Sequence, residues 1–245
     1  MKAVFLDKDG TLVEDVPYNV DPARITLKPG AREGVRALAA AGYKLAVVTN
    51  QSGIARGLFA PSALGPVAIR LRMLLGVELA GFFHCPHHPD GSVPAYAVDC
   101  TCRKPQPEMI LNAARAIGAD LAASWMIGDI LHDVEAGNRA GCRTVLIDNG
   151  GETEWAAGPY RTPTFVARDL AEAARVILSA DRQSSSPAKA GVAREAGDGA
   201  VSPADRGRQR STIRCANGSP HPTGEELMSP APTRTASSLA AGVSA

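Results

Sequence analysis

Two aspartates stand close together near the N-terminus, in the segment FLDKDGTLV. Asp7 and Asp9 are two positions apart after an apolar run, so at a strand end their side chains would point to the same side. Gly10 would then let the chain turn sharply. Two carboxylates at this spacing repel each other unless a cation lies between them or one keeps its proton. A calcium loop is disfavoured, because an EF-hand needs another acid before the glycine and a glutamate at its twelfth position.

Three further segments carry polar residues where strands or helices would begin or end. Thr49, in VVTNQSGIARG, follows an apolar run, and a hydroxyl with backbone N–H groups at such a place suits a phosphate oxygen. Lys104, in CRKPQPEM, precedes a predicted helix start, where a cation could face an anion. Asp129, in MIGDILHD, ends an apolar run, and Asp133 follows near a helix start. Each of these residues also has a purely structural explanation. Thr49 could be a common strand-end threonine, Lys104 a solvated surface lysine, and Asp129 or Asp133 a helix cap.

The densest set of metal-binding residue types is HCPHHPDGSVPAYAVDCTCRKP, over residues 84–105, with three cysteines and three histidines. Four nitrogen and sulfur ligands without an oxygen donor favour tetrahedral Zn²⁺ in a closed, structural site. We expect these ligands to be Cys85, His87, Cys100 and Cys102. Spacing alone does not exclude His84 or His88, although His87 can point to the same side as Cys85 and His88 would point away.

Composition narrows the class of protein. The chain has 245 residues, is 45% hydrophobic and carries a formal charge of +1, which gives no sign of a nucleic-acid-binding surface. It has no apolar run long enough to span a bilayer, and its N-terminus does not resemble a secretory signal. We therefore expect a cytoplasmic protein with reduced thiols, no membrane or nucleic-acid partner, and a monomeric state.

A change in composition predicts two parts. Residues 1–180 are expected to form the folded domain. Residues 181–245 lack Phe, Trp and Tyr and are mostly Ala, Ser, Gly and Pro, so they cannot bury enough apolar surface to offset the entropy of ordering. We expect a disordered tail there, either an inert extension or, as an alternative, an interaction segment.

Within the folded part, short apolar runs alternate with helical stretches. Strands are predicted at 3–7, 44–50, 81–85, 124–129 and 143–148, and helices at 30–41, 61–75, 106–117, 132–140 and 168–179. Alternation of this kind predicts an α/β fold, a doubly wound, Rossmann-like parallel sheet with helices on both faces. Ligands bind beyond the carboxyl ends of such strands, so Asp7, Thr49 with Asn50, and Asp129 should meet at one rim.

The four segments occur in the order D-x-D-G-T, T-N, K-P, G-D-x-x-x-D. Over roughly residues 1–150 this order resembles the haloacid dehalogenase superfamily of phosphotransferases. The resemblance implies that Asp7 attacks phosphorus and forms an aspartyl-phosphate, while Asp9 first donates and then accepts a proton. It further implies Mg²⁺ held by Asp7, by the backbone carbonyl of Asp9 and by Asp129.

The same resemblance gives roles to the remaining motif residues. Thr49 and Lys104 would bind the phosphoryl oxygens, where charge is spread in the transition state. Asp133 would orient Lys104 or a metal-bound water. The short segment between Asp9 and Asn50 already contains a predicted helix, which leaves no room for a large cap domain and predicts an open active site.

Together with TNQSGIARG, the pattern H-C-P-H-H-P…D-C-x-C-R-K-P resembles the branch of heptose bisphosphate 7-phosphatases and histidinol phosphatases. This resemblance implies zinc on the four ligands named above, in a loop that carries Arg103 and Lys104 to the active site. It also implies that substrate is contacted by residues at three places. These contacts are Asp15 and Tyr18, then Thr49, Asn50, Gln51 and Ser52, then Arg103 and Lys104. A second phosphate needs extra cations, for which Arg103, Lys104 and Arg56 are available.

The implied substrate is a small phosphorylated sugar, D-glycero-D-manno-heptose 1,7-bisphosphate, which would lose its 7-phosphate on the way to nucleotide-activated heptose. Histidinol phosphate or another small phosphomonoester is the alternative. A non-catalytic, zinc-stabilised binding domain is a third, which the intact motifs disfavour. One residue departs from the branch: Ile130 follows Asp129 where Lys, Arg or Ser is common. Because an apolar side chain donates no hydrogen bond, this departure bears on substrate or anomer preference.

Overall fold

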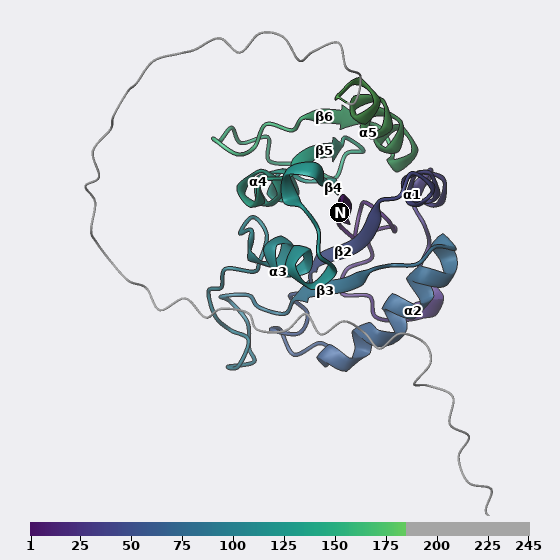
Figure 1. Ribbon diagram of the computed structural model, residues 1–245. Helices are drawn as coiled ribbons and strands as arrows, with labels where there is room; N and C mark the ends of the chain where they lie inside the picture. The colour runs from purple at the N-terminus through teal and green to yellow at the C-terminus, as the bar shows by residue number, and fades with distance from the viewer. Residues whose placement is uncertain (185–245) are drawn as a thin grey trace, which may run out of the picture.

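Short apolar runs form one parallel sheet in the computed structural model, which describes residues 1–184 (Figure 1). The strands are β1 (Ala3–Leu6), β2 (Lys44–Asn50), β3 (Gly81–Cys85), β4 (Trp125–Gly128), β5 (Arg143–Ile147) and β6 (Phe165–Ala167). Their order is β3-β2-β1-β4-β5-β6, and every neighbouring pair is parallel. Helices hide both faces of such a sheet, and accordingly every residue of β1 and β4 is buried.

Helices form a layer on each face of the sheet (Figure 1). One layer contains α1 (Ala31–Ala40), α2 (Leu64–Leu75) and α5 (Leu170–Ser184), and the other contains α3 (Glu108–Ile117) and α4 (Leu131–Ala140). Alternate residues of β1 divide between the two cores: Val4 and Leu6 pack with the first layer, and Ala3 and Phe5 with the second. This period of two is what a strand covered on both faces requires. Short 3-10 helices occur at Pro22–Arg24, Pro61–Ala63 and Leu121–Ala123.

The predicted doubly wound α/β fold is confirmed, and the five predicted strands occur within one or two residues of the expected ends. The sixth strand, β6, was missed, because it is only three residues long and two of them are exposed. It pairs with β5 at the edge of the sheet, and its Phe165 ring stacks on Trp125 at 5.8 Å between centroids. The predicted helix over 61–75 begins as a 3-10 turn and becomes α-helical at Leu64.

Helix α5 extends beyond the predicted boundary at residue 180. It continues to Ser184, and Asp181 ties its last turn to the sheet through ion pairs with Lys2 at 3.4 Å and Arg143 at 3.0 Å. Residues 181–184 are therefore the end of a helix and not the start of a tail. The rest of the predicted disordered segment lies outside the described residues.

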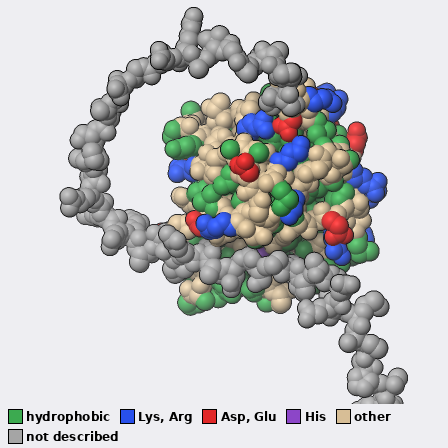
Figure 2. Space-filling model, in the orientation of Figure 1, with side chains coloured by type: hydrophobic (Ala, Val, Ile, Leu, Met, Phe, Trp, Pro, Cys, Tyr) green, Lys and Arg blue, Asp and Glu red, His purple; other side chains and the backbone are tan. Residues whose placement is uncertain are grey.

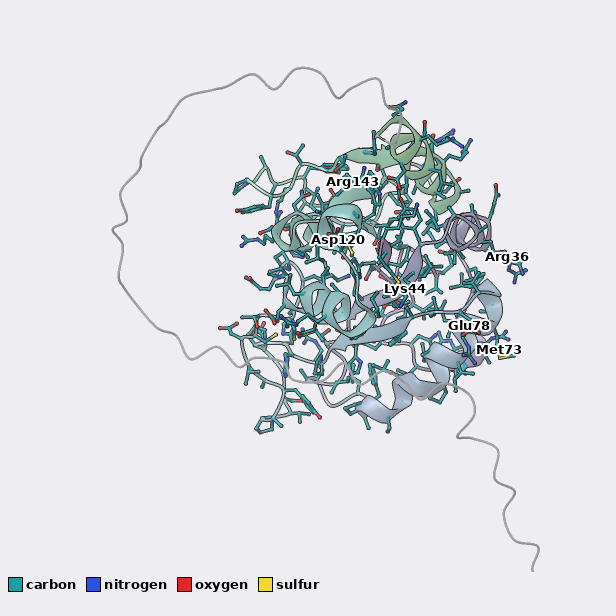
Figure 3. All side chains as sticks on the ribbon, viewed as in Figure 1. Arg36, Lys44, Met73, Glu78, Asp120 and Arg143 are labelled. Carbon is teal, nitrogen blue, oxygen red and sulfur yellow. The ribbon has the colours of Figure 1, made fainter. Side chains whose placement is uncertain are left out.

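The surface shows no single charged face in the orientation of Figure 2, where lysine, arginine and acidic side chains are interspersed. In Figure 3, Arg36 and Met73 project outward from α1 and α2, and Met73 is 66% exposed. Within residues 1–184, helices long and apolar enough to cross a bilayer are absent.

Candidate active site

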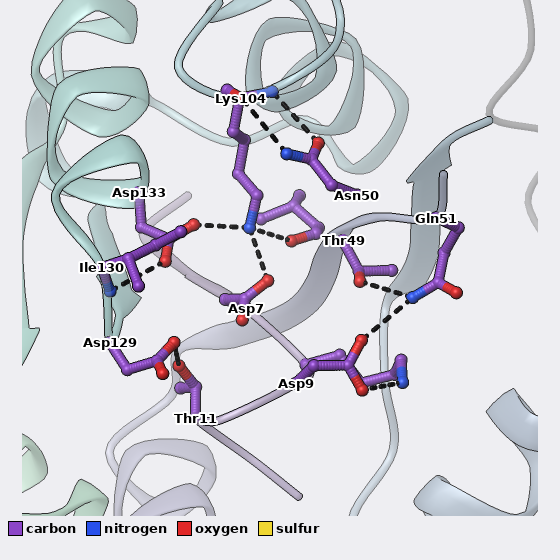
Figure 4. A network of polar contacts seen from close by, with 12 residues as sticks. Asp7, Asp9, Thr11, Thr49, Asn50, Gln51, Lys104, Asp129, Ile130 and Asp133 are labelled. Carbon is purple, nitrogen blue, oxygen red and sulfur yellow. Dashed lines mark hydrogen bonds and ion pairs between the residues drawn. The ribbon is translucent and has the colours of Figure 1, made fainter. Parts of the chain in front are cut away.

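The loop that follows β1 brings two strand ends into contact at the carboxyl edge of the sheet (Figure 4). The backbone N–H of Asp7 donates to the Ile127 carbonyl of β4 at 2.9 Å. Gly10 has a φ of +82°, and a Cβ there would lie 2.0 Å from Oδ2 of Asp129. Glycine is thus required both by the backbone conformation and by the close approach of Asp129. The loop holding Asp7 and Asp9 therefore lies directly against Asp129, at the predicted rim.

A buried lysine joins the acids from the opposite side. Nζ of Lys104 lies 2.5 Å from Oδ1 of Asp7, 2.5 Å from Oδ1 of Asp133 and 3.1 Å from the carbonyl of Val48. Asn50, at the end of β2, holds the backbone of Lys104 with two hydrogen bonds of 3.1 Å, one donated and one accepted. The Lys104 ammonium is therefore positioned both by the hydrogen bonds to its backbone and by its own ion pairs (Figure 4).

The acid cluster consists of Asp7, Asp129 and Asp133, each of which offers an oxygen within 4.8 Å of the others. Burial, and then repulsion from Asp133, Asp129 and Asp9, raise the pKa of Asp7, while Lys104 opposes the rise. Burial and Asp133 raise the pKa of Asp129 to about 6. Burial by itself would lower the pKa of Lys104, but Asp133 and Asp7 raise it overall. One lysine does not balance three carboxylates, and a set of oxygen donors with excess negative charge suits Mg²⁺.

Asp133 is already engaged on both carboxylate oxygens. Oδ1 pairs with Lys104, and Oδ2 accepts a hydrogen bond of 3.4 Å from the backbone N–H of Ile130, just before α4. Its side chain is only 1% exposed. These contacts indicate that Asp133 orients Lys104. They leave neither oxygen of Asp133 available to bind a metal directly.

The carboxylate of Asp9 points away from the acid cluster. Its Oδ2 accepts from Nε2 of Gln51 at 3.1 Å, and its Oδ1 pairs with the ammonium of Lys8. Gln51 also donates to the hydroxyl of Thr49 at 2.9 Å. The side chain of Asp9 is 30% exposed, so it can exchange protons with a ligand in the cavity while its backbone stays beside Asp7.

The site opens into one cavity of about 570 Å³. Its walls include most of the predicted site residues, namely Asp7, Asp9, Asp15, Tyr18, Thr49, Asn50, Gln51, Ser52, Lys104, Asp129 and Asp133. Ile130 also lines it, as do Glu14 and Lys28, which the sequence did not single out. Arg103 is not among the lining residues; its Nη1 lies 3.5 Å from the carbonyl of His87. A substrate contact by Arg103 therefore remains a prediction.

Three further residues that support the site were missed from the sequence. The Thr11 hydroxyl donates to Asp129 at 3.2 Å, and Nδ2 of Asn149 donates to the Gly10 carbonyl at 2.8 Å. Glu152 accepts a 2.6 Å hydrogen bond from the backbone N–H at the start of α4. Thr11 belongs to the D-x-D-G-T motif, and Asn149 precedes a Gly-Gly pair after β5. The sequence context of Thr11 and Asn149 could therefore have indicated a role in the site, whereas the sequence around Glu152 carries no such signal.

The cysteine and histidine cluster forms outside the cavity. Ligand atoms of Cys85, His87, Cys100 and Cys102 all lie within 4.8 Å of one another. Sγ of Cys85 is 3.2 Å from Sγ of Cys102, and Nδ1 of His87 is 3.5 Å from the same sulfur. The hydrogen bond between Cys85 and Cys100 lowers the pKa of Cys100 to about 5. The same hydrogen bond, together with burial, raises the pKa of Cys85, so in the pair Cys100 is the thiol that favours the metal-binding thiolate form. Sulfur and nitrogen donors in this arrangement fit zinc.

His87 is the histidine of this segment whose ring nitrogen faces the sulfurs. His88 faces elsewhere: its Nδ1 accepts from the Asp90 backbone N–H at 3.1 Å, and its Nε2 lies 3.4 Å from Arg56. The side-chain alternation along the strand end thus separates the two neighbouring histidines, as the spacing favoured.

Comparison with known proteins gives the same family from sequence and from structure. A HAD-hydrolase-like family model matches residues 101–173. The chain is 37% identical over 178 residues to the D-glycero-beta-D-manno-heptose-1,7-bisphosphate 7-phosphatase of Yersinia pestis, which covers 71% of this chain and 94% of that protein. It is 43% identical over 152 residues to the protein of the same name from Photorhabdus laumondii, covering 60% and 81%.

Two solved structures share both fold and sequence. A putative HAD-like phosphatase from Mesorhizobium loti has a TM-score of 0.65 and 38% identity, covering 75% of this chain and 87% of that one. The D,D-heptose 1,7-bisphosphate phosphatase of B. bronchiseptica, complexed with magnesium and phosphate, has a TM-score of 0.63 and 34% identity, covering 74% and 99%. The fold is therefore that of a HAD-like phosphatase. The chain belongs to the HAD-like family that contains the heptose bisphosphate 7-phosphatases.

Proposed function

We propose that this chain is a phosphoric monoester hydrolase that removes the 7-phosphate from D-glycero-D-manno-heptose 1,7-bisphosphate, in the biosynthesis of nucleotide-activated heptose. The observation that carries the proposal is the contact of Lys104 with both Asp7 and Asp133 beside Asp129, in a chain that matches nearly the full length of a named 7-phosphatase. The complex of a similar structure with magnesium and phosphate supports the same chemistry.

In the first step an oxygen of Asp7 attacks phosphorus, and the bond from phosphorus to the sugar oxygen breaks. Asp9 gives its proton to that oxygen, so the sugar leaves as an alcohol and the phosphoryl group stays on Asp7. In the second step Asp9 takes a proton from water, whose oxygen attacks phosphorus. Inorganic phosphate leaves, and Asp7 is again a carboxylate.

The surrounding residues orient this reaction. The Lys104 ammonium, which now contacts Asp7, would shift one hydrogen bond to a phosphoryl oxygen, and the Thr49 hydroxyl would bind another. Gln51 fixes the side chains of Asp9 and Thr49 relative to each other by donating a hydrogen bond to each. Asp7, the carbonyl of Asp9 and Asp129 would hold Mg²⁺. Bound there, the ion would neutralise phosphate charge and lower the repulsion between carboxylate and phosphate.

The cysteine and histidine cluster would hold a structural Zn²⁺, since four soft or borderline donors leave no open position for a substrate. We further propose that the phosphatase domain ends with α5 and acts as a cytoplasmic monomer. Asp7, Asp9, Lys104 and Asp129, the residues proposed to carry the chemistry, all line this one cavity of the chain.

One feature favours a second substrate. Asp15 lines the exposed part of the cavity, and its carboxylate would attract the ammonium of histidinol phosphate, whereas the carboxylate of Glu14 is paired with Lys28. The test compares kcat/KM for heptose 1,7-bisphosphate with kcat/KM for histidinol phosphate, measured as phosphate release with Mg²⁺. We expect the bisphosphate to be preferred at least about tenfold, a difference of about 1.4 kcal/mol. A preference for histidinol phosphate would overturn the proposed substrate.

A further inference from the structure

A lysine outside every sequence motif lies on the wall of the catalytic cavity. Lys28 lines the cavity together with Asp7 and Lys104. Its backbone N–H donates to the Leu12 carbonyl at 3.0 Å, and a β-bridge joins the preceding residue to the chain just after the catalytic loop. The position of Lys28 is therefore tied to the segment that carries Asp7, although the two residues are far apart in the sequence.

Among the described residues, the ion-pair partner of Lys28 is the exposed Glu14, and the charge of Lys28 also opposes the rise that burial causes in the pKa of nearby Asp15. Nζ of Lys28 lies 3.2 Å from Oε2 of Glu14, and the two side chains are 24% and 47% exposed. Ion pairs of this kind contribute about 0–1 kcal/mol, since water solvates both groups well. A phosphate group carries more negative charge than one carboxylate at neutral pH, so it can displace Glu14 from Lys28 at little cost.

Lys104 is in a different position. An ammonium has three N–H donors, and Lys104 directs them to Asp7, Asp133 and the Val48 carbonyl. Its side chain is 3% exposed, at the floor of the cavity. When substrate binds, it can serve the phosphoryl group under attack, but it has no donor left for a second phosphate. Among the described residues that line the cavity, Lys28 is the lysine or arginine that remains.

We infer that Lys28 binds the phosphate that is not transferred, and that it makes the enzyme prefer bisphosphorylated sugars to sugars with one phosphate. The inference rests on the proposed phosphatase function. It extends that function by assigning a residue that binds the end of the substrate opposite to the reacting phosphate. Ile130, also on the wall, has no donor to offer, and the guanidinium of Arg103 points to the zinc loop.

The experiment measures kcat/KM for heptose 1,7-bisphosphate and for heptose 7-phosphate in four proteins: the wild type, Lys28→Met, Lys28→Arg and the charge-matched control Lys2→Met. Lys2 precedes β1 at the opposite edge of the sheet. In Lys28→Met we expect the ratio of the two constants to fall roughly tenfold, mainly through KM of the bisphosphate, because binding away from the reacting atoms is lost. Lys28→Arg should recover most of the ratio, and Lys2→Met should keep the wild-type ratio.

Two results would overturn the inference: a ratio in Lys28→Met within about twofold of the wild type, or an equal loss for both substrates, which a structural role would cause. Failure of the proposed substrate looks different. If the wild type prefers histidinol phosphate, the heptose assignment is lost, and the ratio for a hexose 1,6-bisphosphate over a hexose 6-phosphate decides the role of Lys28 in the same four proteins. A wild type with no preference for the bisphosphate in either pair would also overturn it.

Discussion

Residues 102–104 connect the cysteine and histidine cluster to the acid cluster, because Cys102 belongs to the first and Lys104 pairs with Asp7 and Asp133 of the second. The two clusters nevertheless differ in donor type, charge and access. The acid cluster has oxygen donors, a surplus of negative charge and an open cavity beside it. The other has sulfur and nitrogen donors packed against each other, and Cys85 and Cys102 are almost fully buried within the second core. The acid cluster leaves room for a substrate beside a bound metal. The cysteine and histidine cluster would fill all four coordination positions of a metal with protein side chains.

This difference separates two uses of a metal. An open set of hard oxygen donors suits an ion that contacts the substrate, whereas a closed set of soft donors suits an ion that holds a loop. The loop held in this way ends two residues before Lys104, whose backbone Asn50 then fixes from β2. The zinc site would thus support the catalytic lysine from one side and the sheet from the other.

The largest effect should come from the acid cluster. Asp7→Asn removes the attacking oxygen, and we expect phosphate release with Mg²⁺ to fall at least about a thousandfold. Thermal unfolding should stay at or above the wild-type temperature, because one buried charge is lost from a crowded set. Asp148→Asn, which alters an exposed aspartate outside the cavity, is the matched control and should keep its activity. Residual activity above a few per cent in Asp7→Asn would contradict covalent catalysis by this residue.

The next effect tests the coupling of the two clusters. Cys100→Ala should release zinc and lower kcat/KM by roughly 10- to 100-fold, the range seen when groups that support a catalytic ligand are removed. Metal content by mass spectrometry and activity are measured on the same sample. Cys142→Ala is the control, because Cys142 is a buried thiol away from the cluster, and it should retain zinc. A zinc-free Cys100→Ala protein with full activity would show that the two sites are independent.

The acid cluster should also make stability depend on pH and Mg²⁺ together. The pKa of Asp129 is raised from 3.8 to about 6 in the folded, metal-free chain. Its contribution to stability is therefore fully present below about pH 4 and is lost as the pH rises through about 6. Mg²⁺ needs the ionised carboxylate, so its stabilising effect should grow over the same interval.

Melting curves with and without Mg²⁺ at about pH 5 and about pH 7.5 test this expectation. At a Mg²⁺ concentration near a hundred times its Kd, the melting temperature should rise by roughly 5–10 °C at the higher pH, and by much less at the lower one. Asp129→Asn should remove the difference between the two pH values. An equal Mg²⁺ shift at both would place the ion elsewhere.

The smallest effect concerns a supporting contact of the acid cluster. Asn149→Ala removes the 2.8 Å hydrogen bond to the Gly10 carbonyl, which is worth about 1 kcal/mol. We expect kcat to fall a few-fold with little change in KM, because Asp7 and Asp9 become less well placed while the cavity keeps its shape. Asn112→Ala on α3 is the control and should match the wild type. A change confined to KM would mean that Asn149 contacts substrate instead.

Local spacing was enough to predict much of this molecule. Asp7 and Asp9 at the end of a strand, Asp129 at the end of another, and the paired Cys85-x-His87 and Cys100-x-Cys102 are patterns within a few residues. The backbone geometry of a strand or turn largely decides where such side chains point. The parallel fold followed from alternating apolar runs, which can be buried in few ways. The edge strand β6 escaped this reasoning because so short and exposed a segment carries little hydrophobic signal.

Contacts between distant segments were decided only by the tertiary structure. Asn50 forms a hydrogen bond with the backbone of Lys104, 54 residues away in the sequence. Asn149 donates a hydrogen bond to the carbonyl of Gly10, 139 residues away. Lys28 reaches the cavity because its segment pairs with the chain beyond the catalytic loop, and Arg103, which the motif favoured as a substrate ligand, points to His87. A side chain's local sequence limits its direction, but its partners depend on which loops the packed sheet and helices bring together. That information exists only once the core has formed.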